Sequence, residues 1–169
     1  MNNTTIELST PASTRSEGFL EGRFSYFTQK EIENGKVIPD NLYGNIIPTM
    51  LVLDYLREKI REPIYINSTY RDPEYNRAVG GAKNSLHLVF NAVDFTIRRE
   101  SALLKMRDIK TIYKMLDDFD KNGMGETSRI IMMKRNCFGL GLYLRGSQSF
   151  IHLDTRGLIG RAAPVRWRG

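Results

Sequence analysis

Apolar residues recur every three or four positions in two long stretches, and each stretch is predicted to be an amphipathic helix. The first covers about residues 41–60 and follows a turn and cap at residues 38–40. The second covers about residues 101–120, and residues 121–123 end it, because a glycine commonly stands just after a helix.

Around these helices the pattern changes to short alternating segments bounded by glycine, proline and other turn residues, which is typical of strands. Along the chain, helices come first and strands mixed with helices follow. This order predicts an α+β domain with a small, mainly antiparallel sheet and helices packed on it. Gly139 and Gly141 indicate a tight approach, and residues 145–148 a hairpin turn. Expected strands cover residues 64–69, 92–97, 129–134, 140–144 and 150–153. One short helix is expected after Thr28, with Glu31 completing a capping box, and another over about residues 73–79.

Length and composition favour one folded domain behind a short arm. Residues 1–18 are polar, rich in Ser and Thr and aperiodic, so they are expected to form a flexible arm before the domain at 19–169. A chain of 169 residues with 41% hydrophobic content buries roughly two thirds of its unfolded surface. One cysteine, Cys137, excludes an intramolecular disulfide and a thiolate cluster, and is expected to be a buried apolar residue.

The N-terminus has neither a charged region nor an apolar core, so no secretory signal is predicted. No run of about 18 apolar residues is present, so no membrane span is predicted either. The net charge is +6, and no acid follows Asp154. The arginines after it are either a solvated terminus or a surface that attracts an anionic polymer, such as cell-wall glycan or nucleic acid. They are Arg156, Arg161, Arg166 and Arg168.

The chain has only two histidines, His87 and His152, and each lies in an apolar segment near an aspartate. Catalytic zinc takes three protein ligands, drawn from imidazole and carboxylate, and keeps one open position. His87, Asp94 and His152 would supply that set, although their spacing alone leaves open that both histidines are ordinary surface or core residues.

The neighbours of these residues carry a fuller pattern. Residues 66–87 read INSTYRDPEYNRAVGGAKNSLH, residues 139–157 contain GLGLY and FIHLDTRG, and an Arg-Trp pair follows at 166–167. These two stretches resemble the signatures of the zinc D-alanyl-D-alanine carboxypeptidase and murein endopeptidase family. That family shares its metal site with lysostaphin-type endopeptidases and the hedgehog domain. The resemblance covers nearly the whole domain and implies their fold for this chain.

The resemblance implies that His87, Asp94 and His152 are the zinc ligands. It implies that Arg71 stabilises the oxyanion of the tetrahedral intermediate, the alternative being a salt bridge that holds its loop. Ser85 matches a serine that places the first ligand or binds substrate, and its alternative role is to cap the turn before His87.

The general base is left open by the sequence. Asp154 is the best local candidate, because a carboxylate near a metal-bound water can accept its proton. Asp154 could instead orient His152 from behind. Glu126 and Asp72 are the remaining candidates. The chain departs from the family at Phe90, where a glycine is expected; the phenylalanine either lines the cleft and narrows substrate choice or marks a drifted copy.

The resemblance predicts a zinc metallopeptidase, of carboxypeptidase or murein endopeptidase type, that hydrolyses peptidoglycan stem peptides or cross-links with a zinc-activated water. A phage lytic enzyme, or endolysin, fits the missing signal: it is made in the cytoplasm and acts on the cell wall, although a secreted enzyme stays open. We expect a monomer with a peptidoglycan peptide, rather than nucleic acid, as its partner. The alternatives are an inactive zinc-containing binding module and a basic nucleic-acid or virion-structural protein.

Overall fold

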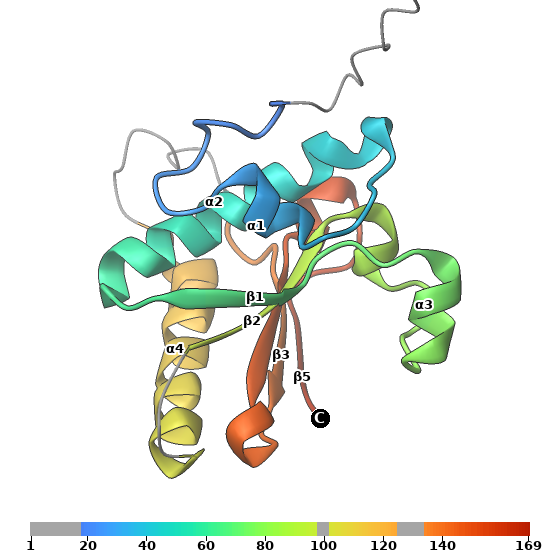
Figure 1. Ribbon diagram of the computed structural model, residues 1–169. Coiled ribbons are helices and arrows are strands. Elements are labelled where there is room, and N and C mark those ends of the chain that lie inside the picture. The colour runs from blue at the N-terminus through green and yellow to red at the C-terminus, as the bar shows by residue number, and fades with distance from the viewer. Residues whose placement is uncertain (1–17, 98–101, 125–133) are drawn as a thin grey trace, which may run out of the picture.

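The computed structural model describes residues 18–97, the backbone of 102–106, and residues 107–124 and 134–169 (Figure 1). Its helices pack on one five-stranded sheet, which confirms the predicted α+β class. The expected arm, apart from Gly18, and the expected strand at 129–134, apart from Lys134, lie outside the described residues. Within the described chain, no helix has the length and apolar character needed to cross a membrane.

The sheet has the strand order β1-β2-β4-β3-β5, and its neighbours are antiparallel except for the parallel pair β3 and β5. Four strands agree with the alternating pattern, whereas β5 was not predicted: part of the arginine-rich tail forms an edge strand. The bounds are β1 Ile64–Ser68, β2 Ala92–Ile97, β3 Gly139–Tyr143, β4 Phe150–Asp154 and β5 Val165–Arg168.

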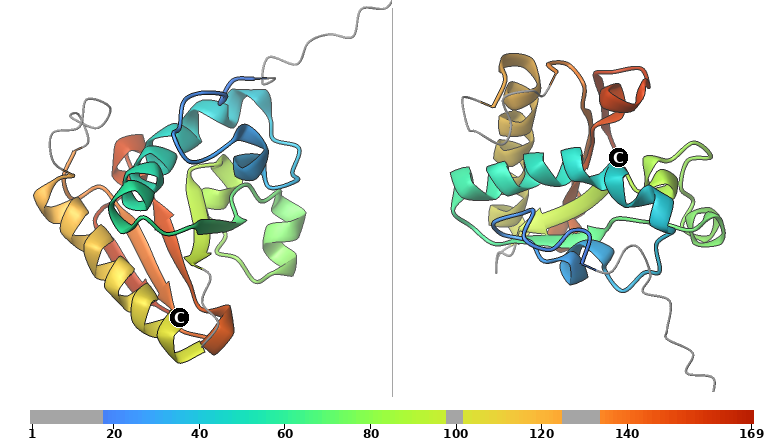
Figure 2. Two further views of the ribbon diagram at one scale, coloured as in Figure 1. Left: turned by 60° about the vertical axis from the view of Figure 1, so that its left-hand side comes forward. Right: turned by 90° about the horizontal axis from the view of Figure 1, so that it is seen from above.

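The two long predicted helices are present as α2, Tyr43–Ile60, and α4, Ala102–Asn122. α2 runs across one end of the sheet and α4 runs along it, while α3, Pro73–Ala78, stands on the opposite side from α4 (Figures 1 and 2). The short α1, Gln29–Glu33, begins with the predicted capping box of Thr28 and Glu31. Short 3-10 turns are η1 Asp40–Leu42, η2 Leu86–Val89, η3 Gly146–Gln148 and η4 Arg156–Ile159.

The hydrophobic core lies between the long helices and one face of the sheet. Because side chains alternate along a strand, the other face is left for different residues. β2 buries Val93 and Phe95 in the core, and β4 buries Ile151 and Leu153 in the same way. Asp94 and His152, the residues between them, therefore point to the opposite face. Helix residues in the core include Ile46, Met50, Leu53, Leu56, Ile109, Ile112 and Leu116.

A buried acid ties α4 to the far edge of the sheet. Asp120 is fully buried and accepts hydrogen bonds from the backbone N–H groups of Cys137 and Phe138. The Arg166 guanidinium on β5 donates to Asp120 at 2.6 Å and to Asp117 at 2.7 Å. Arg166 is thus part of the fold rather than of a solvated tail. Burial raises the pKa of the neighbouring Cys137 thiol to about 12, which fits its expected structural role.

Candidate metal centre

One cross-strand row brings the centre together. Asp94 on β2 pairs with His152 on β4, His152 pairs with Gly141 on β3, and Gly141 pairs with Trp167 on β5. Directly opposed residues on neighbouring strands project to the same face. A β-carbon on Gly141 would lie 2.5 Å from the Trp167 indole nitrogen, so this glycine lets the ring lie against the strand. The Trp167 ring then reaches His152, with centroids 5.1 Å apart.

His87 reaches the row from the turn η2, and its backbone is fixed at both ends. Ser85 caps the turn and accepts a hydrogen bond from the His87 backbone N–H at 3.3 Å. Phe90 ends the turn in the left-handed conformation, with φ 52°. The His87 carbonyl accepts from the Arg71 backbone N–H at 3.1 Å, which ties this turn to the loop that follows β1.

Three donor atoms meet at one point. Nε2 of His87 lies 3.2 Å from Nδ1 of His152 and 3.2 Å from Oδ1 of Asp94, and the latter two atoms are 2.8 Å apart. Tetrahedral zinc with bonds of about 2.0–2.1 Å separates its ligands by roughly 3.3 Å. The donor set and its spacing therefore fit zinc with little adjustment, and all three side chains are buried.

The hydrogen-bond partners on the outer side of each imidazole determine its tautomer, and so which nitrogen faces inward without a proton. His87 Nδ1 faces the Thr69 carbonyl, which can only accept, so that nitrogen carries the proton. His152 Nε2 faces a carboxylate oxygen of Asp154 at 3.0 Å, so it is assigned its proton in the same way. In their neutral forms both rings then point a lone pair at Asp94. Three acceptors facing one another repel unless a cation or a proton lies between them, and this pattern is typical of metal-binding histidines.

Burial and neighbouring charges set the protonation of the three groups. Burial lowers the pKa of His87 and favours the neutral form that a metal requires. Burial alone would raise the pKa of Asp94, but hydrogen bonds with His152 and His87 hold it well below its usual range. For His152, burial lowers the pKa, while hydrogen bonds with Asp154 and Asp94 outweigh it and raise the value.

Arg71 and Asp154 flank the centre on two sides. Arg71 donates to Oδ2 of Asp94, the oxygen that faces away from the histidines, and to Ser68 Oγ at 3.0 Å. Asp154 is fully buried behind His152, where Arg156 donates to both of its oxygens. Burial would raise the pKa of Asp154, but hydrogen bonds with Arg156 and His152 lower it to about 2. Of the two roles that the sequence left open for Asp154, this arrangement favours the orienting one.

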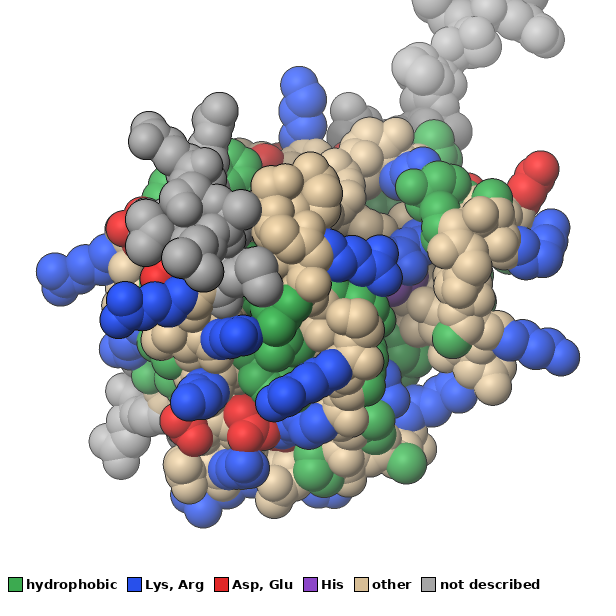
Figure 3. Space-filling model, turned by 90° about the horizontal axis from the view of Figure 1, so that it is seen from below, with side chains coloured by type: hydrophobic (Ala, Val, Ile, Leu, Met, Phe, Trp, Pro, Cys, Tyr) green, Lys and Arg blue, Asp and Glu red, His purple; other side chains and the backbone are tan. Residues whose placement is uncertain are grey.

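The centre opens into a cleft of about 470 Å³, and a histidine surface is visible in a hollow edged by Lys and Arg side chains (Figure 3). An adjoining hollow of about 370 Å³ lies toward β1 and shares Arg71, Asp94, Arg145 and Phe150 with the cleft. In the part of the chain that the structure describes, Asp94 is the one carboxylate that lines either hollow. Other residues lining the cleft include Ser85, Tyr143, Arg156 and Trp167.

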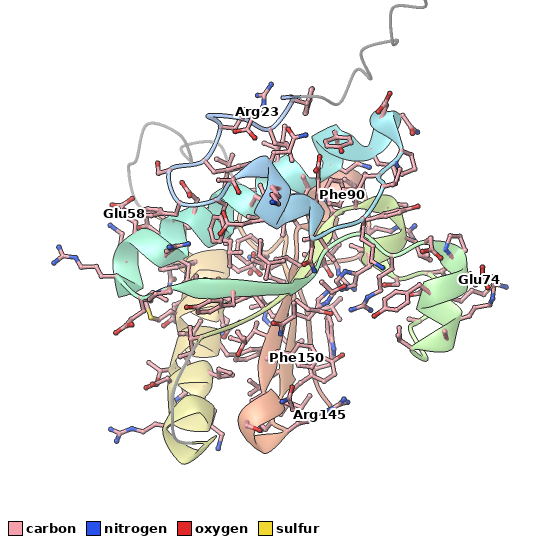
Figure 4. All side chains as sticks on the ribbon, viewed as in Figure 1. Arg23, Glu58, Glu74, Phe90, Arg145 and Phe150 are labelled. Atoms are coloured by element: carbon pink, nitrogen blue, oxygen red, sulfur yellow. The ribbon has the colours of Figure 1, made fainter. Side chains whose placement is uncertain are left out.

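Two sequence expectations are answered by this geometry. The interpretation that Phe90 lines the cleft is wrong. Its side chain is fully buried beside Tyr43 and Tyr70 and lies away from Phe150 and Arg145 (Figure 4). Asp72 caps α3 by accepting from the Tyr75 backbone N–H, and it does not line the cleft either. Glu126 lies outside the described residues.

Sequence reasoning did not identify the residues that complete the cleft wall. Arg156 belongs to the DTRG stretch, and its position two residues after Asp154 was a usable signal for the ion pair. The predicted hairpin turn at residues 145–148 joins two strands, but it gives no sign that Arg145 and Phe150 line the cleft beside His152.

Comparison with known proteins agrees with this site. The family model for Peptidase M15 matches residues 23–133, which is more than half of the chain and contains both His87 and Asp94. His152 lies beyond the matched segment, and the fold brings it to the other two residues. No curated protein matches the sequence. The chain therefore belongs to the M15 family of peptidases, whose members are zinc-dependent.

Proposed function

We propose that this protein is a zinc metallopeptidase that hydrolyses peptide bonds in peptidoglycan stem peptides or cross-links. The observation that carries the proposal is the convergence of His87, Asp94 and His152, with their lone pairs facing one another, at the head of a cleft in an M15 peptidase. When bound there, zinc supplies a Lewis acid that polarises the scissile carbonyl and makes water a better nucleophile.

The surrounding residues have separate tasks in this proposal. Arg71 lies beside Asp94 and lines both hollows, so its guanidinium is placed to stabilise the negative charge that develops on the carbonyl oxygen. Asp154 holds the proton of His152 on Nε2 and so keeps Nδ1 available as a ligand. Ser85 holds His87 through its backbone and, since it lines the cleft, also contacts substrate.

The charge of the cleft suits an acidic peptide. Arg71, Arg145 and Arg156 line it; Asp94 pairs with Arg71 and the buried Asp154 with Arg156, so Arg145 supplies a positive charge without an ion pair among the described residues. Stem peptides of peptidoglycan carry free carboxylates, so they fit such a surface better than neutral peptides do. In this proposal the protein acts as a monomer on the cell wall, in the manner of a phage lytic enzyme, and does not bind nucleic acid.

A second candidate is a zinc-containing binding module without turnover. It is favoured by one observation: apart from the ligand Asp94, none of the described cleft residues is a carboxylate that could act as general base. This candidate predicts one equivalent of zinc and tight binding of muropeptides, but no cleavage.

Metal analysis combined with a digest of purified muropeptides tests both candidates. The wild type is expected to hold one equivalent of zinc and to release cleaved peptides, and His152→Ala is expected to lose both properties. Arg161→Gln, which removes an exposed arginine outside the cleft, serves as a matched control and should keep both. Wild type without zinc would overturn both candidates, and zinc without cleavage would leave the binding module. Loss of cleavage in Asp154→Asn at saturating zinc would return the base role to Asp154.

A further inference from the structure

The hairpin between β3 and β4 carries a rigid aromatic and cationic surface. The rings of Tyr143 and Phe150 stack with centroids 4.3 Å apart and planes 7° from parallel. The Arg145 guanidinium lies over the Tyr143 ring, 5.5 Å from its centre. We call Tyr143, Arg145 and Phe150 the hairpin platform. Stacking on an aromatic face restricts an arginine and leaves its N–H edges directed outward.

The turn that presents Arg145 is itself held in place. The Arg145 backbone N–H donates to Ser149 Oγ at 2.9 Å, and the Ser149 hydroxyl donates to the Gly146 carbonyl at 2.8 Å. Trp167 adds support from β5, since its indole N–H donates to the Tyr143 hydroxyl at 2.8 Å. The hairpin platform is therefore joined to the same edge strand that packs on His152.

Arg145 faces the same space as the metal centre. It lines both the cleft and the adjoining hollow, and Arg71 and Asp94 line both as well. Arg145 and Phe150 lie together at the lower end of the hairpin (Figure 4). A substrate with its scissile bond beside Asp94 therefore has one end within the reach of Arg145.

The three arginines of the cleft differ in what they bind. Arg71 is paired with Asp94 and Arg156 with Asp154, whereas Arg145 has no carboxylate within ion-pair distance among the described residues. An exposed arginine is commonly just solvated. Arg145 differs because it is stacked, its turn is hydrogen-bonded, and it lines the cleft of a peptidase. A planar guanidinium in such a position matches a carboxylate with two parallel hydrogen bonds.

The residue spacing along β3 sets the scale of the separation between the metal centre and Arg145. His152 is opposite Gly141, and Tyr143 under the guanidinium is two residues further along, about 7 Å at 3.4 Å per residue. In a peptide, the next carboxyl carbon follows the scissile carbonyl by about 3.6 Å. An ion pair adds up to about 4 Å. The sum is roughly 7–8 Å, so Arg145 reaches a carboxylate one residue beyond the scissile bond.

We propose that Arg145 binds the free terminal carboxylate of the substrate, so that the enzyme is a carboxypeptidase that removes one residue at a time rather than an endopeptidase. The proposal rests on the peptidase function proposed above. A side-chain carboxylate on the last residue would offer the same chemistry from another source, and the experiment separates the two.

The test compares three acylated peptides on the zinc-loaded protein. One ends in D-Ala-D-Ala, the second is its terminal amide, and the third ends in D-Ala-D-Glu α-amide, which offers only a side-chain carboxylate. Wild type is expected to prefer the acid over its amide by roughly 10- to 100-fold in kcat/KM, mainly through KM. Arg145→Gln should bring this preference below about threefold without loss of zinc, whereas the control Arg161→Gln should keep it.

Equal use of acid and amide by the wild type would overturn the inference, and so would a preference that survives in Arg145→Gln. A dependence on Arg145 that appears only with the D-Glu α-amide would overturn it in favour of the side-chain source. If no peptide is hydrolysed, the proposed activity has failed, and binding decides the inference. Trp167, the only tryptophan, lines the cleft, so its fluorescence reports peptide binding. Tighter binding of the acid that Arg145→Gln abolishes would support the carboxylate site, and equal affinities would overturn it.

Discussion

Replacing Phe90 by glycine tests two contributions to stability at this position: the strain of its left-handed backbone and the burial of its ring. Phe90 has φ 52° and ψ 45°, a left-handed conformation that glycine adopts without strain. Its ring is fully buried and makes edge-to-face contacts with Tyr43 at 5.8 Å and Tyr70 at 6.3 Å. The two effects of Phe90→Gly therefore have opposite signs.

The ring dominates when both effects are given magnitudes. A non-glycine residue in the left-handed region costs about 1–2 kcal/mol, and glycine removes that strain. Glycine also loses more backbone entropy on folding, which cancels about 0.5–1 kcal/mol of this gain. Removing a buried phenylalanine ring costs about 3–5 kcal/mol. Phe90→Gly is thus expected to lower the free energy of unfolding by about 2–4 kcal/mol, although it restores the residue that the family pattern contains.

Denaturant unfolding of the metal-free protein, followed by circular dichroism, measures this change. Phe90→Ala keeps the left-handed strain and loses the same ring, so comparison of the two variants isolates the backbone contribution. Zinc content of Phe90→Gly should match the wild type, because the turn that holds His87 keeps its conformation. An unchanged or higher stability would refute the assignment of the ring to the core. Loss of zinc from a folded variant would refute its separation from the metal centre.

Three further expectations follow from particular contacts. Asp154→Asn should weaken zinc binding by roughly 10- to 100-fold in competition with a chelator, and unchanged affinity would contradict the orienting role. Gly141→Ala should move the Trp167 ring, altering its fluorescence and costing about 1–3 kcal/mol in a denaturant titration; unaltered emission and stability would argue against the close approach. Burial would raise the pKa of Asp117, but hydrogen bonds with Lys121 and Arg166 lower it. The carboxylate therefore stabilises the fold at pH values above its unfolded pKa of 3.8, and this stabilisation is lost as the pH falls through the lower folded pKa. The stability difference between wild type and Asp117→Asn should therefore shrink from pH 7 to pH 3, and a constant difference would contradict it.

The long helices and four of the strands could be predicted because local periodicity determines them. The spacing of apolar residues placed α2 and α4, and alternation placed Asp94 and His152 on strands. The tight approach expected at Gly139 and Gly141 is also present, since β-carbons there would meet Asp154 and Trp167. In each case the information lies within a few residues of the element that it determines.

The last strand could not be predicted for the opposite reason. β5 reads VRWR and pairs in parallel with β3, which lies more than twenty residues earlier in the chain. Its stability comes from distant partners, above all the contacts of Arg166 with Asp117 and Asp120 on α4. The four residues alternate apolar and charged side chains, but so short a segment gives no local sign of such a clamp, and the sequence alone favours a tail.

The position of Asp154 shows why a correct face assignment does not settle a catalytic role. Residues two apart on a strand share a face, so the sequence placed Asp154 beside His152. Asp94 lies across the sheet from His152, while Asp154 lies along the same strand, and the imidazole ring stands between the two carboxylates. In the proposed zinc site, one ring nitrogen is thereby left for the metal and the other for Asp154. A general base must come within about 3 Å of the proton that it removes, or reach it through one water. The width of the ring separates Asp154 from that position, and its ion pair with Arg156 holds it there.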